Sequence, residues 1–240
     1  MNKNILFPFS LVVGLIGAAL IISKPWVTIH HAEPIMVKGY AERDVKADQG
    51  SLTVRISERG ADNGEAYEKA GTSLEMARKL IVDTLGEDAE LVELSSSLSE
   101  TKKLNEKGNR TNDVDYVTAT RSLRVNSSQV ENLKAMSRQL YDLNGEGLRL
   151  TLSGPEFFVS KLDEVKIDLM KRATKNGRER AEIMAKSSGE KLGSLVSARQ
   201  GVIQITKPNS TRTSSYGIYD TETIEKVVKL VVTLEFKIGK

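Results

Sequence analysis

Few residues of this chain have the type and spacing that catalysis requires. Ser188 and Lys191 match the S-x-x-K pattern, in which a lysine activates a serine nucleophile for acyl transfer. That chemistry needs both side chains on one helical turn, whereas Gly189 is expected to end a helix between them, and no S-D-N or K-T-G element accompanies the pair. We therefore expect no enzyme, and a hydrolase built on Ser188 is the alternative.

Other reactive groups are also scarce. The 240 residues contain no cysteine, which excludes disulfides, thiolate nucleophiles and cysteine metal ligands. The two histidines, His30 and His31, are adjacent and lie near the N-terminus, where no distant general base can easily join them. The sequence shows no metal-ligand spacing and no phosphate-binding glycine loop. We therefore expect no cofactor, no catalytic residue and no metal.

Basic side chains do gather on one predicted helix face. Lys171, Lys175 and Arg178 lie at positions i, i+4 and i+7, where they could meet phosphates or anionic lipid headgroups. Glu179 and Glu182 dilute that field, so a solvated face is the favoured interpretation. The net charge of +3, with 28% charged residues, indicates a mixed surface rather than a nucleic-acid binder.

An apolar run at residues 5–22, interrupted only by Ser10, predicts a membrane anchor. As a helix, it would span roughly 27 Å, close to the thickness of a bilayer's hydrocarbon core. A cleaved signal peptide is the alternative, although no good A-x-A site follows the run. We expect an uncleaved transmembrane helix at 1–24 and a juxtamembrane linker at 25–34, with a weak charge bias that points the rest of the chain outward.

Hydrophobic periodicity predicts an α+β fold for 35–240, with three amphipathic helices packed on one face of a mainly antiparallel sheet. Capping residues and apolar stripes place the helices at 62–86, 128–145 and 160–188. Extended segments are predicted at 35–37, 52–56, 90–104, 116–125, 148–152, 157–159, 195–205 and 228–238. The last segment alternates most cleanly, so it should be central in the sheet.

The longest helix has a buried face rich in small residues. Its predicted members are Leu162, Val165, Leu169, Ala173, Gly177, Ala181, Met184 and Ala185. A glycine within a helix costs roughly 1 kcal/mol relative to alanine, so Gly177 predicts a close contact that compensates.

Three residues are candidates for an oligomer interface. Arg121 occupies the apolar phase of its strand and would face inward, where it needs a carboxylate partner. An intersubunit salt bridge is one interpretation, and a β-bulge or a solvated second face is the other. Lys107 and Asn109 lie in the polar loop 105–115, at the tip of a predicted long, exposed hairpin.

A second candidate region is the Ser/Thr-rich loop at 206–223, which carries Tyr216 and Tyr219. Loops of this length without secondary structure are usually functional or mobile. We therefore consider it a candidate binding loop for a small molecule or a partner protein.

Several segments together resemble the SIMPL-domain family. They are RERAEIMAK at 178–186, GEKLG at 189–193, IMVKG at 35–39, YVTAT at 116–120 and the pair Ala47-Asp48. With the alternating final strand they cover nearly all of 33–240. Two positions depart from the family pattern, since Ala47 stands where proline is usual and Gly177 where alanine is usual. Physically, the motifs suit close helix–sheet packing and a glycine-terminated helix.

The resemblance implies a bacterial envelope protein with its domain in the periplasm. Relatives are linked to oxidative-stress defence or described as periplasmic immunogenic proteins, and some form ring-like homo-oligomers. The family has no agreed activity, so it supplies no catalytic residues. We expect a non-enzymatic, single-pass inner-membrane protein that self-assembles, with a periplasmic protein released by signal cleavage as the alternative for location. A sensor or binding module for an unidentified ligand is the alternative for function.

Overall fold

A computed structural model describes residues 34–86 and 89–239. The predicted anchor at 1–24 and nearly all of the linker lie outside these residues. Within the described part, no helix is both long enough and apolar enough to span a membrane. The described chain forms two compact units, one from 34–42, 166–203 and 229–239, the other from 43–86, 89–165 and 204–228. Strands β1 (Ile35–Lys46) and β10 (Glu225–Gly239) contribute residues to both units.

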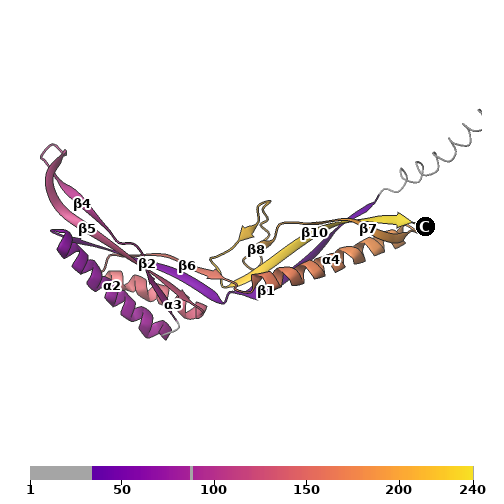
Figure 1. Cartoon of the computed structure of the whole chain (residues 1–240), viewed down its shortest axis with the longest axis horizontal. Coiled ribbons are helices and arrows are strands. Elements are labelled where there is room, and N and C mark those ends of the chain that lie inside the picture. The colour runs from indigo at the N-terminus through magenta and orange to yellow at the C-terminus, as the bar shows by residue number, and fades with distance from the viewer. Residues whose placement is uncertain (1–33, 87–88, 240) are drawn as a thin grey trace, which may run out of the picture. The chain divides into compact units, whose positions relative to one another are not determined.

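The larger unit contains an antiparallel sheet with strand order β3-β5-β2-β6, in which β4 also pairs with β5. Its strands are β2 (Gln49–Gly60), β3 (Glu90–Glu93), β4 (Ser97–Leu104), β5 (Arg110–Ser127) and β6 (Leu150–Phe158). Helices α2 (Asn63–Leu85) and α3 (Val130–Asp142), followed by the short 3₁₀ helix η2 (Leu143–Glu146), lie against one face of this sheet (Figure 1).

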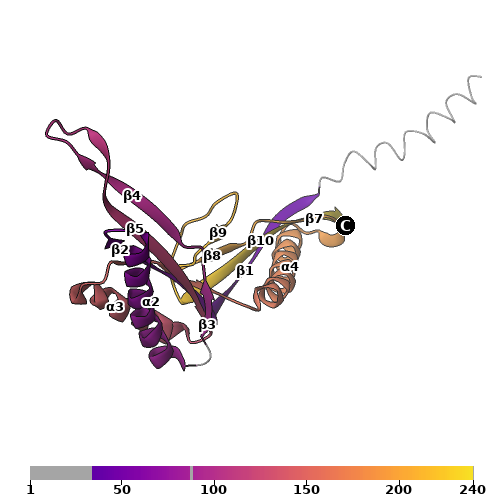
Figure 2. The same ribbon diagram turned by 60° about the vertical axis from the view of Figure 1, so that its left-hand side comes forward.

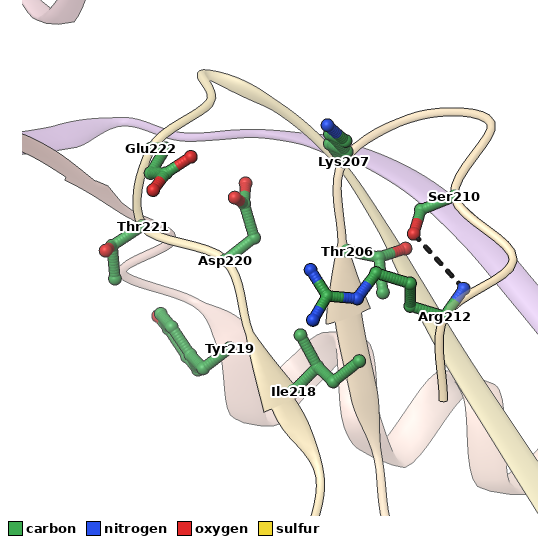
Figure 3. A pocket seen from close by; sticks show the side chains of 9 residues that line it. All are labelled: Thr206, Lys207, Ser210, Arg212, Ile218, Tyr219, Asp220, Thr221 and Glu222. Atoms are coloured by element: carbon green, nitrogen blue, oxygen red, sulfur yellow. Dashed lines mark hydrogen bonds between the residues drawn. The ribbon is translucent and has the colours of Figure 1, made fainter. Parts of the chain in front are cut away.

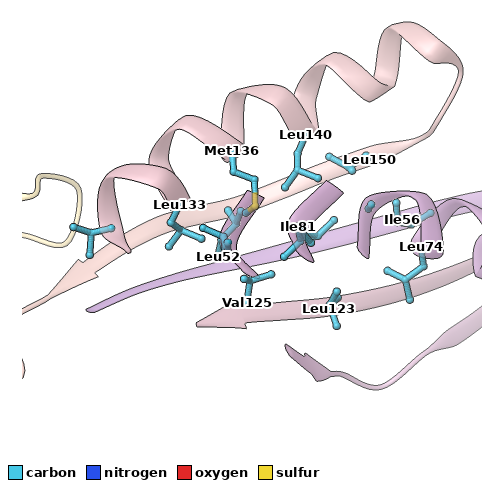
Figure 4. Packing of buried hydrophobic residues seen from close by; sticks show 14 of the residues in the cluster. Leu52, Ile56, Leu74, Ile81, Leu123, Val125, Leu133, Met136, Leu140 and Leu150 are labelled. Carbon is cyan, nitrogen blue, oxygen red and sulfur yellow. The ribbon is translucent and has the colours of Figure 1, made fainter. Parts of the chain in front are cut away.

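The core of this unit lies between the two helices and the sheet (Figure 4). Leu52 and Ile56 from β2 and Leu123 from β5 are fully buried there, together with Leu74 and Leu133 from the helices. Burying a side chain of this kind stabilises the fold by roughly 1.5–3 kcal/mol. The alternation of apolar residues along β2 and β5 therefore gives the sheet one dry face.

Helix α2 begins at the predicted capping residues. The Asp62 side chain accepts a hydrogen bond from the Glu65 amide (2.9 Å), and the Glu65 carboxylate accepts one from the Ala61 amide (2.6 Å). These bonds satisfy backbone donors that the first helical turn would leave unpaired. Gly86, with φ of 69°, ends the helix as predicted.

Strands β4 and β5 extend beyond the rest of the sheet as a two-stranded ribbon (Figure 2). The predicted loop at 105–115 is wrong in length, because β5 already begins at Arg110. The turn is tight because the Asn105 side chain accepts hydrogen bonds from the amides of Lys107 (3.0 Å) and Asn109 (2.9 Å). Gly108 supplies the positive φ that the turn requires.

The smaller unit contains a second sheet, in which β10 pairs with β1 on one side and with β7 (Lys191–Gln200) on the other. The prediction that the last strand is central is therefore confirmed. Helix α4 (Leu162–Ser187) packs on this sheet through the contacts described next. The expectation of a single sheet carrying all three helices is wrong: the α+β class holds, but the strands form two mostly antiparallel sheets.

Gly39 of β1 and Gly177 of α4 meet backbone to backbone. A Cβ atom added at Gly39 would lie 2.1 Å from the carbonyl oxygen of Ala173 and 2.7 Å from the Gly177 nitrogen. No side chain fits there, so strand and helix approach as closely as two backbones can. This is the compensating contact that Gly177 predicts.

The buried stripe of α4 consists of a residue at every fourth position, namely Val165, Leu169, Ala173, Gly177, Ala181 and Ala185. Met184 is 50% exposed, contrary to the prediction. It lies about 100° around the helix from Ala185, outside the narrow face that the sheet covers.

The predicted strand at 195–205 is interrupted, and its second part is β8 (Gln204–Thr206), which pairs in parallel with β9 (Ile218–Tyr219). The loop predicted at 206–223 therefore contains a short strand, β9, and residues 207–217 connect β8 to it. Both arms of the Gln204 side chain hold that loop, since Nε2 donates to the Ser214 carbonyl (2.7 Å) and Oε1 accepts from the Ser214 amide (3.3 Å). These two hydrogen bonds hold the loop at Ser214 to strand β8.

Candidate functional site

A cavity of about 270 Å³ lies in the predicted binding loop (Figure 3). All its lining residues fall between Thr206 and Glu222, from the end of β8 to the segment that follows β9. Ile218 and the ring of Tyr219 supply the apolar part of the wall, and the other lining side chains are polar or charged.

A buried ion pair supports one wall of this cavity. Lys226 of β10 is fully buried, and its ammonium donates to the backbone carbonyl of Asp220 (2.5 Å) and to its Oδ2 (3.2 Å). The Thr223 amide (3.3 Å) and hydroxyl also donate to Oδ2. A buried charge is tolerated only when paired and hydrogen-bonded, so Lys226 holds the Asp220 segment in place.

These contacts also set the charge of Asp220. Burial by itself would raise the pKa of this carboxyl, but the hydrogen bonds from Thr223 and Lys226 and the nearby ammonium outweigh burial and lower the pKa below its usual value. Asp220 is therefore ionised at neutral pH. Among the described residues none donates to its second oxygen, Oδ1, which remains available at the cavity.

Thr206, at the end of β8, carries an unsatisfied hydroxyl. The residue is 2% exposed, and its Oγ1 has no hydrogen-bond partner among the residues that the structure describes. A buried polar group without a partner typically costs about 1–3 kcal/mol. Buried polar groups are normally hydrogen-bonded, so this hydroxyl calls for a bound water or a ligand group as its partner.

Charges of opposite sign line two sides of the cavity. Lys207 and Arg212 follow β8, and the Arg212 guanidinium points into the space above Ile218 (Figure 3). Asp220 and Glu222 follow β9 on the other side. Within the described chain, Lys207 and Arg212 form no ion pair with these carboxylates, so the space between them separates the charges.

The two tyrosines of the predicted binding loop have different positions. Tyr219 lines the cavity, and its ring centroid lies 6.3 Å from that of Phe158. Tyr216 is 96% exposed and does not line the cavity. Of the pair, only Tyr219 lies where a bound molecule could touch it.

Arg121, the first candidate interface residue, faces the α2 side of the sheet opposite Ile56, as its strand phase predicts. Its guanidinium contacts Glu93 (3.3 Å) and lies 5.2 Å from the ring centroid of Tyr67. Arg78 binds the other oxygen of Glu93. The carboxylate that Arg121 needs thus comes from its own chain, and a role between subunits stays a prediction.

Lys107 and Asn109 lie in the exposed turn at the tip of the β4–β5 ribbon, as predicted. The structure therefore separates the three candidate interface residues, with Arg121 under α2 and the other two at the tip.

Ser188 and Lys191 are not on one helical turn. Helix α4 ends in a Schellman motif, in which the Gly189 amide donates to the Lys186 carbonyl (3.1 Å) and the Glu190 amide donates to the Ala185 carbonyl (2.9 Å). The Ser188 hydroxyl donates to the Met184 carbonyl, and Lys191 already belongs to β7. This geometry does not form a serine–lysine pair.

On the exposed face of α4, two of the basic residues are paired with glutamates one turn away, Lys175 with Glu179 (3.9 Å) and Arg178 with Glu182 (2.9 Å). Exposed pairs of this kind contribute little to stability. Among the residues that the structure describes, no cluster of His, Asp or Glu could hold a metal ion.

The sequence predicted the loop but missed Thr206, Asp220 and Lys226. Lys226 was detectable, because it extends the alternating phase of Val228 and Leu230 at the start of β10, where a lysine must be paired if it is buried. The unsatisfied hydroxyl of Thr206 had no signal in the sequence, since it depends on where the folded loop leaves space.

Two α+β units, one with α2 and α3 and the other with α4 against a mostly antiparallel sheet, define the class of this protein. The model of the SIMPL family, described as a protein of unknown function (DUF541), matches residues 35–235. The chain therefore belongs to the SIMPL family, as its motifs predict. A search of curated proteins found no match.

Proposed function

We propose that this protein is a non-enzymatic component of the bacterial envelope that assembles into a ring-like homo-oligomer. The N-terminal apolar run would anchor it in the inner membrane, with the SIMPL domain in the periplasm. Several anchors in one assembly would raise membrane avidity without any new contact. The physiological role that we propose is tolerance of envelope or oxidative stress.

The observation that carries the proposal is the β4–β5 ribbon. Strand β2 pairs with β5 only as far as Val117, so the part of β5 before that residue pairs with β4 alone. Leu104 of β4, which pairs with Arg110 in this two-stranded part, is 64% exposed. An isolated two-stranded hairpin is at best marginally stable in water, and its open edges attract further strands. A neighbouring subunit would supply the missing support.

The test is the absolute mass of the full-length protein in detergent, measured by light scattering with correction for the micelle. We expect a discrete multiple of the protomer mass. A shortened variant replaces residues 103–113 with Asn-Gly. Lys102 and Val114 lie directly opposite each other on β4 and β5, so a two-residue turn can join them and close the ribbon. We expect this variant to fold and to lose subunits.

The control variant is Lys175→Gln on α4, outside the ribbon, which should leave the mass unchanged. A monomeric wild-type protein would contradict the proposal. Normal assembly of the shortened variant would move the interface away from the ribbon.

The cavity favours a second candidate function, that of a sensor or binding module. Its support is the unsatisfied Thr206 hydroxyl together with the separated charges around it. A thermal-shift screen of the full-length protein against envelope extracts tests this candidate. No stabilisation by any fraction would count against it.

A further inference from the structure

From the cavity between β8 and the segment after β9, we propose that this protein binds a small zwitterion of the α-amino acid type. The ligand carboxylate would lie between Arg212, Lys207 and the Thr206 hydroxyl, and the ligand ammonium would lie at Asp220 and Glu222. This inference rests on the second candidate function and is independent of ring assembly.

The separation of charges selects a ligand that carries both signs. A simple anion would meet Arg212 and Lys207 but would also lie close to the carboxylates of Asp220 and Glu222. A simple cation would face the reverse problem. A neutral apolar molecule would remove water from four charged side chains without replacing its hydrogen bonds. A molecule with an anionic and a cationic end complements both walls at once.

The carboxylate end of the site combines one fixed and two adjustable groups. The Thr206 hydroxyl is unsatisfied but lies beneath the cavity wall with almost no accessible surface, so a ligand oxygen would reach it only when a neighbouring rim side chain moves aside. Arg212 and Lys207 are exposed at the rim and can turn to the ligand. Arginine suits this role because its planar fork matches a carboxylate.

The ammonium end is already organised. Lys226 and Thr223 hold Oδ2 of Asp220, which fixes the carboxylate orientation and leaves Oδ1 for a ligand donor. Glu222 adds a second, exposed carboxylate at the same wall. An ammonium with three N–H groups can reach both.

The size of the site limits the ligand to a small molecule. The cavity of about 270 Å³ is below the range of roughly 300–1,000 Å³ that is typical of drug-sized ligands. Ile218 and the Tyr219 ring would contact the side chain of the ligand. Free amino acids therefore fit better than peptides.

The test is isothermal titration of the full-length protein with each of the standard L-amino acids at millimolar concentration. For the tightest binder, the corresponding carboxylic acid without the amine and the amine without the carboxylate are titrated next. We expect each analogue to bind at least about tenfold more weakly, because it loses one charge-assisted contact. No binding by any amino acid, or equal binding by the carboxylic acid alone, would overturn the proposal.

Variants separate a ligand role from a structural one. Arg212→Gln and Glu222→Gln should each weaken binding about 10- to 100-fold without changing the melting temperature of the free protein. The controls Lys134→Gln and Glu146→Gln, exposed and outside the cavity, should leave affinity unchanged.

Thr206→Val best separates an effect on ligand affinity from an effect on protein stability. It removes an unsatisfied hydroxyl at nearly constant shape, so the free protein should be at least as stable as the wild type while ligand affinity falls about tenfold. Unchanged affinity in this variant would overturn the assignment of Thr206. Because the readout is a dissociation constant, failure of ring assembly does not affect it.

Discussion

At the scale of single residues, the geometry of the cavity depends on Lys226. A lysine is almost never fully buried unless it is paired, and here the Lys226 ammonium donates two hydrogen bonds to one residue, Asp220. The bond to the backbone carbonyl positions the main chain, and the bond to Oδ2 orients the side chain. Lys226 therefore shapes the binding wall from behind, whereas Asp220 itself lines the cavity.

We expect Asp220→Asn to lower the free energy of unfolding by about 3–5 kcal/mol, because it leaves the Lys226 ammonium buried beside a neutral group. The double variant Asp220→Asn/Lys226→Met should recover much of this loss, since it removes the buried charge as well. Urea denaturation of the four proteins in the cycle measures the coupling. Additive losses would show that the pair is not coupled.

Acid should weaken the same pair. The pKa of Asp220 is lower in the folded protein than in the unfolded chain, so the unfolded chain takes up the proton first as the pH falls. The contribution of Asp220 is complete above the unfolded pKa of about 3.9 and is lost as the pH falls through the folded value below it. Denaturation between pH 7 and pH 2 should show the wild type and Asp220→Asn converging below about pH 4. A constant difference down to the lowest pH would exclude this linkage, and Asp142→Asn at an exposed carboxylate serves as the control.

The orientation of a single side chain could be predicted from the sequence where a charged residue interrupts the apolar alternation of a strand. Arg121 interrupts the apolar phase of β5, and it is indeed inward-facing and paired. Its partner, Glu93, comes from a strand far away in the sequence, so strand periodicity could not name it. The partners of Lys226 were hidden for a related reason: they lie in an irregular loop, whose path follows no period.

At the scale of elements, the contact between Gly39 and Gly177 sets how closely α4 approaches its sheet. Gly39→Ala should lower the free energy of unfolding by about 1–3 kcal/mol or more, because the new Cβ would meet the backbone oxygen of Ala173. Gly177→Ala should cost less, since alanine favours the helix by roughly 1 kcal/mol and the nearest obstacle is the movable side chain of Leu234.

Chemical denaturation of these two variants measures both effects. Gly145→Ala is the matched control, since a Cβ there meets nothing within 4 Å, and it should be nearly neutral. Equal stability of Gly39→Ala and wild type would mean that strand and helix are not in close contact in solution.

Helix ends were predictable where a local cap forms, but the helix predicted at 128–145 spans only Val130–Asp142 and has no side-chain cap at its start. The caps at Asp62 and Gly86 and the Schellman motif at Gly189 each depend on a few consecutive residues, so local sequence determines them. The length of the hairpin loop was predicted less well, since polar residues from Arg110 to Asp115 continue the strand on an exposed ribbon, where no core face imposes alternation.

At the scale of the whole molecule, the division into two sheets could not be predicted from the sequence. Each strand has a recognisable pattern, but the choice of its neighbours is non-local. Helix α4 resembles α2 and α3 in amphipathicity, so its own sequence gives no sign that it packs on β1 and β10 rather than on β2 and β5.

Self-assembly makes a prediction for the whole molecule through mass action. If the folded protein associates and the unfolded chain does not, dilution shifts the balance toward the unfolded chain. The melting temperature of the full-length protein in detergent should therefore rise with protein concentration, and the variant with the shortened ribbon should show a weaker dependence. Differential scanning calorimetry over a hundredfold range of concentration measures it. A melting temperature independent of concentration in the wild type would oppose assembly.

The tip of the ribbon offers a means of counting subunits. Because the chain has no cysteine, Lys107→Cys would place one thiol, and hence one spin label, on an exposed turn that its own hydrogen bonds hold in shape. In a closed ring the labels form a regular polygon. The ratio of the second-nearest to the nearest label distance then depends only on the number of corners, so pulsed electron resonance on this one variant would give the stoichiometry without an image of the particle.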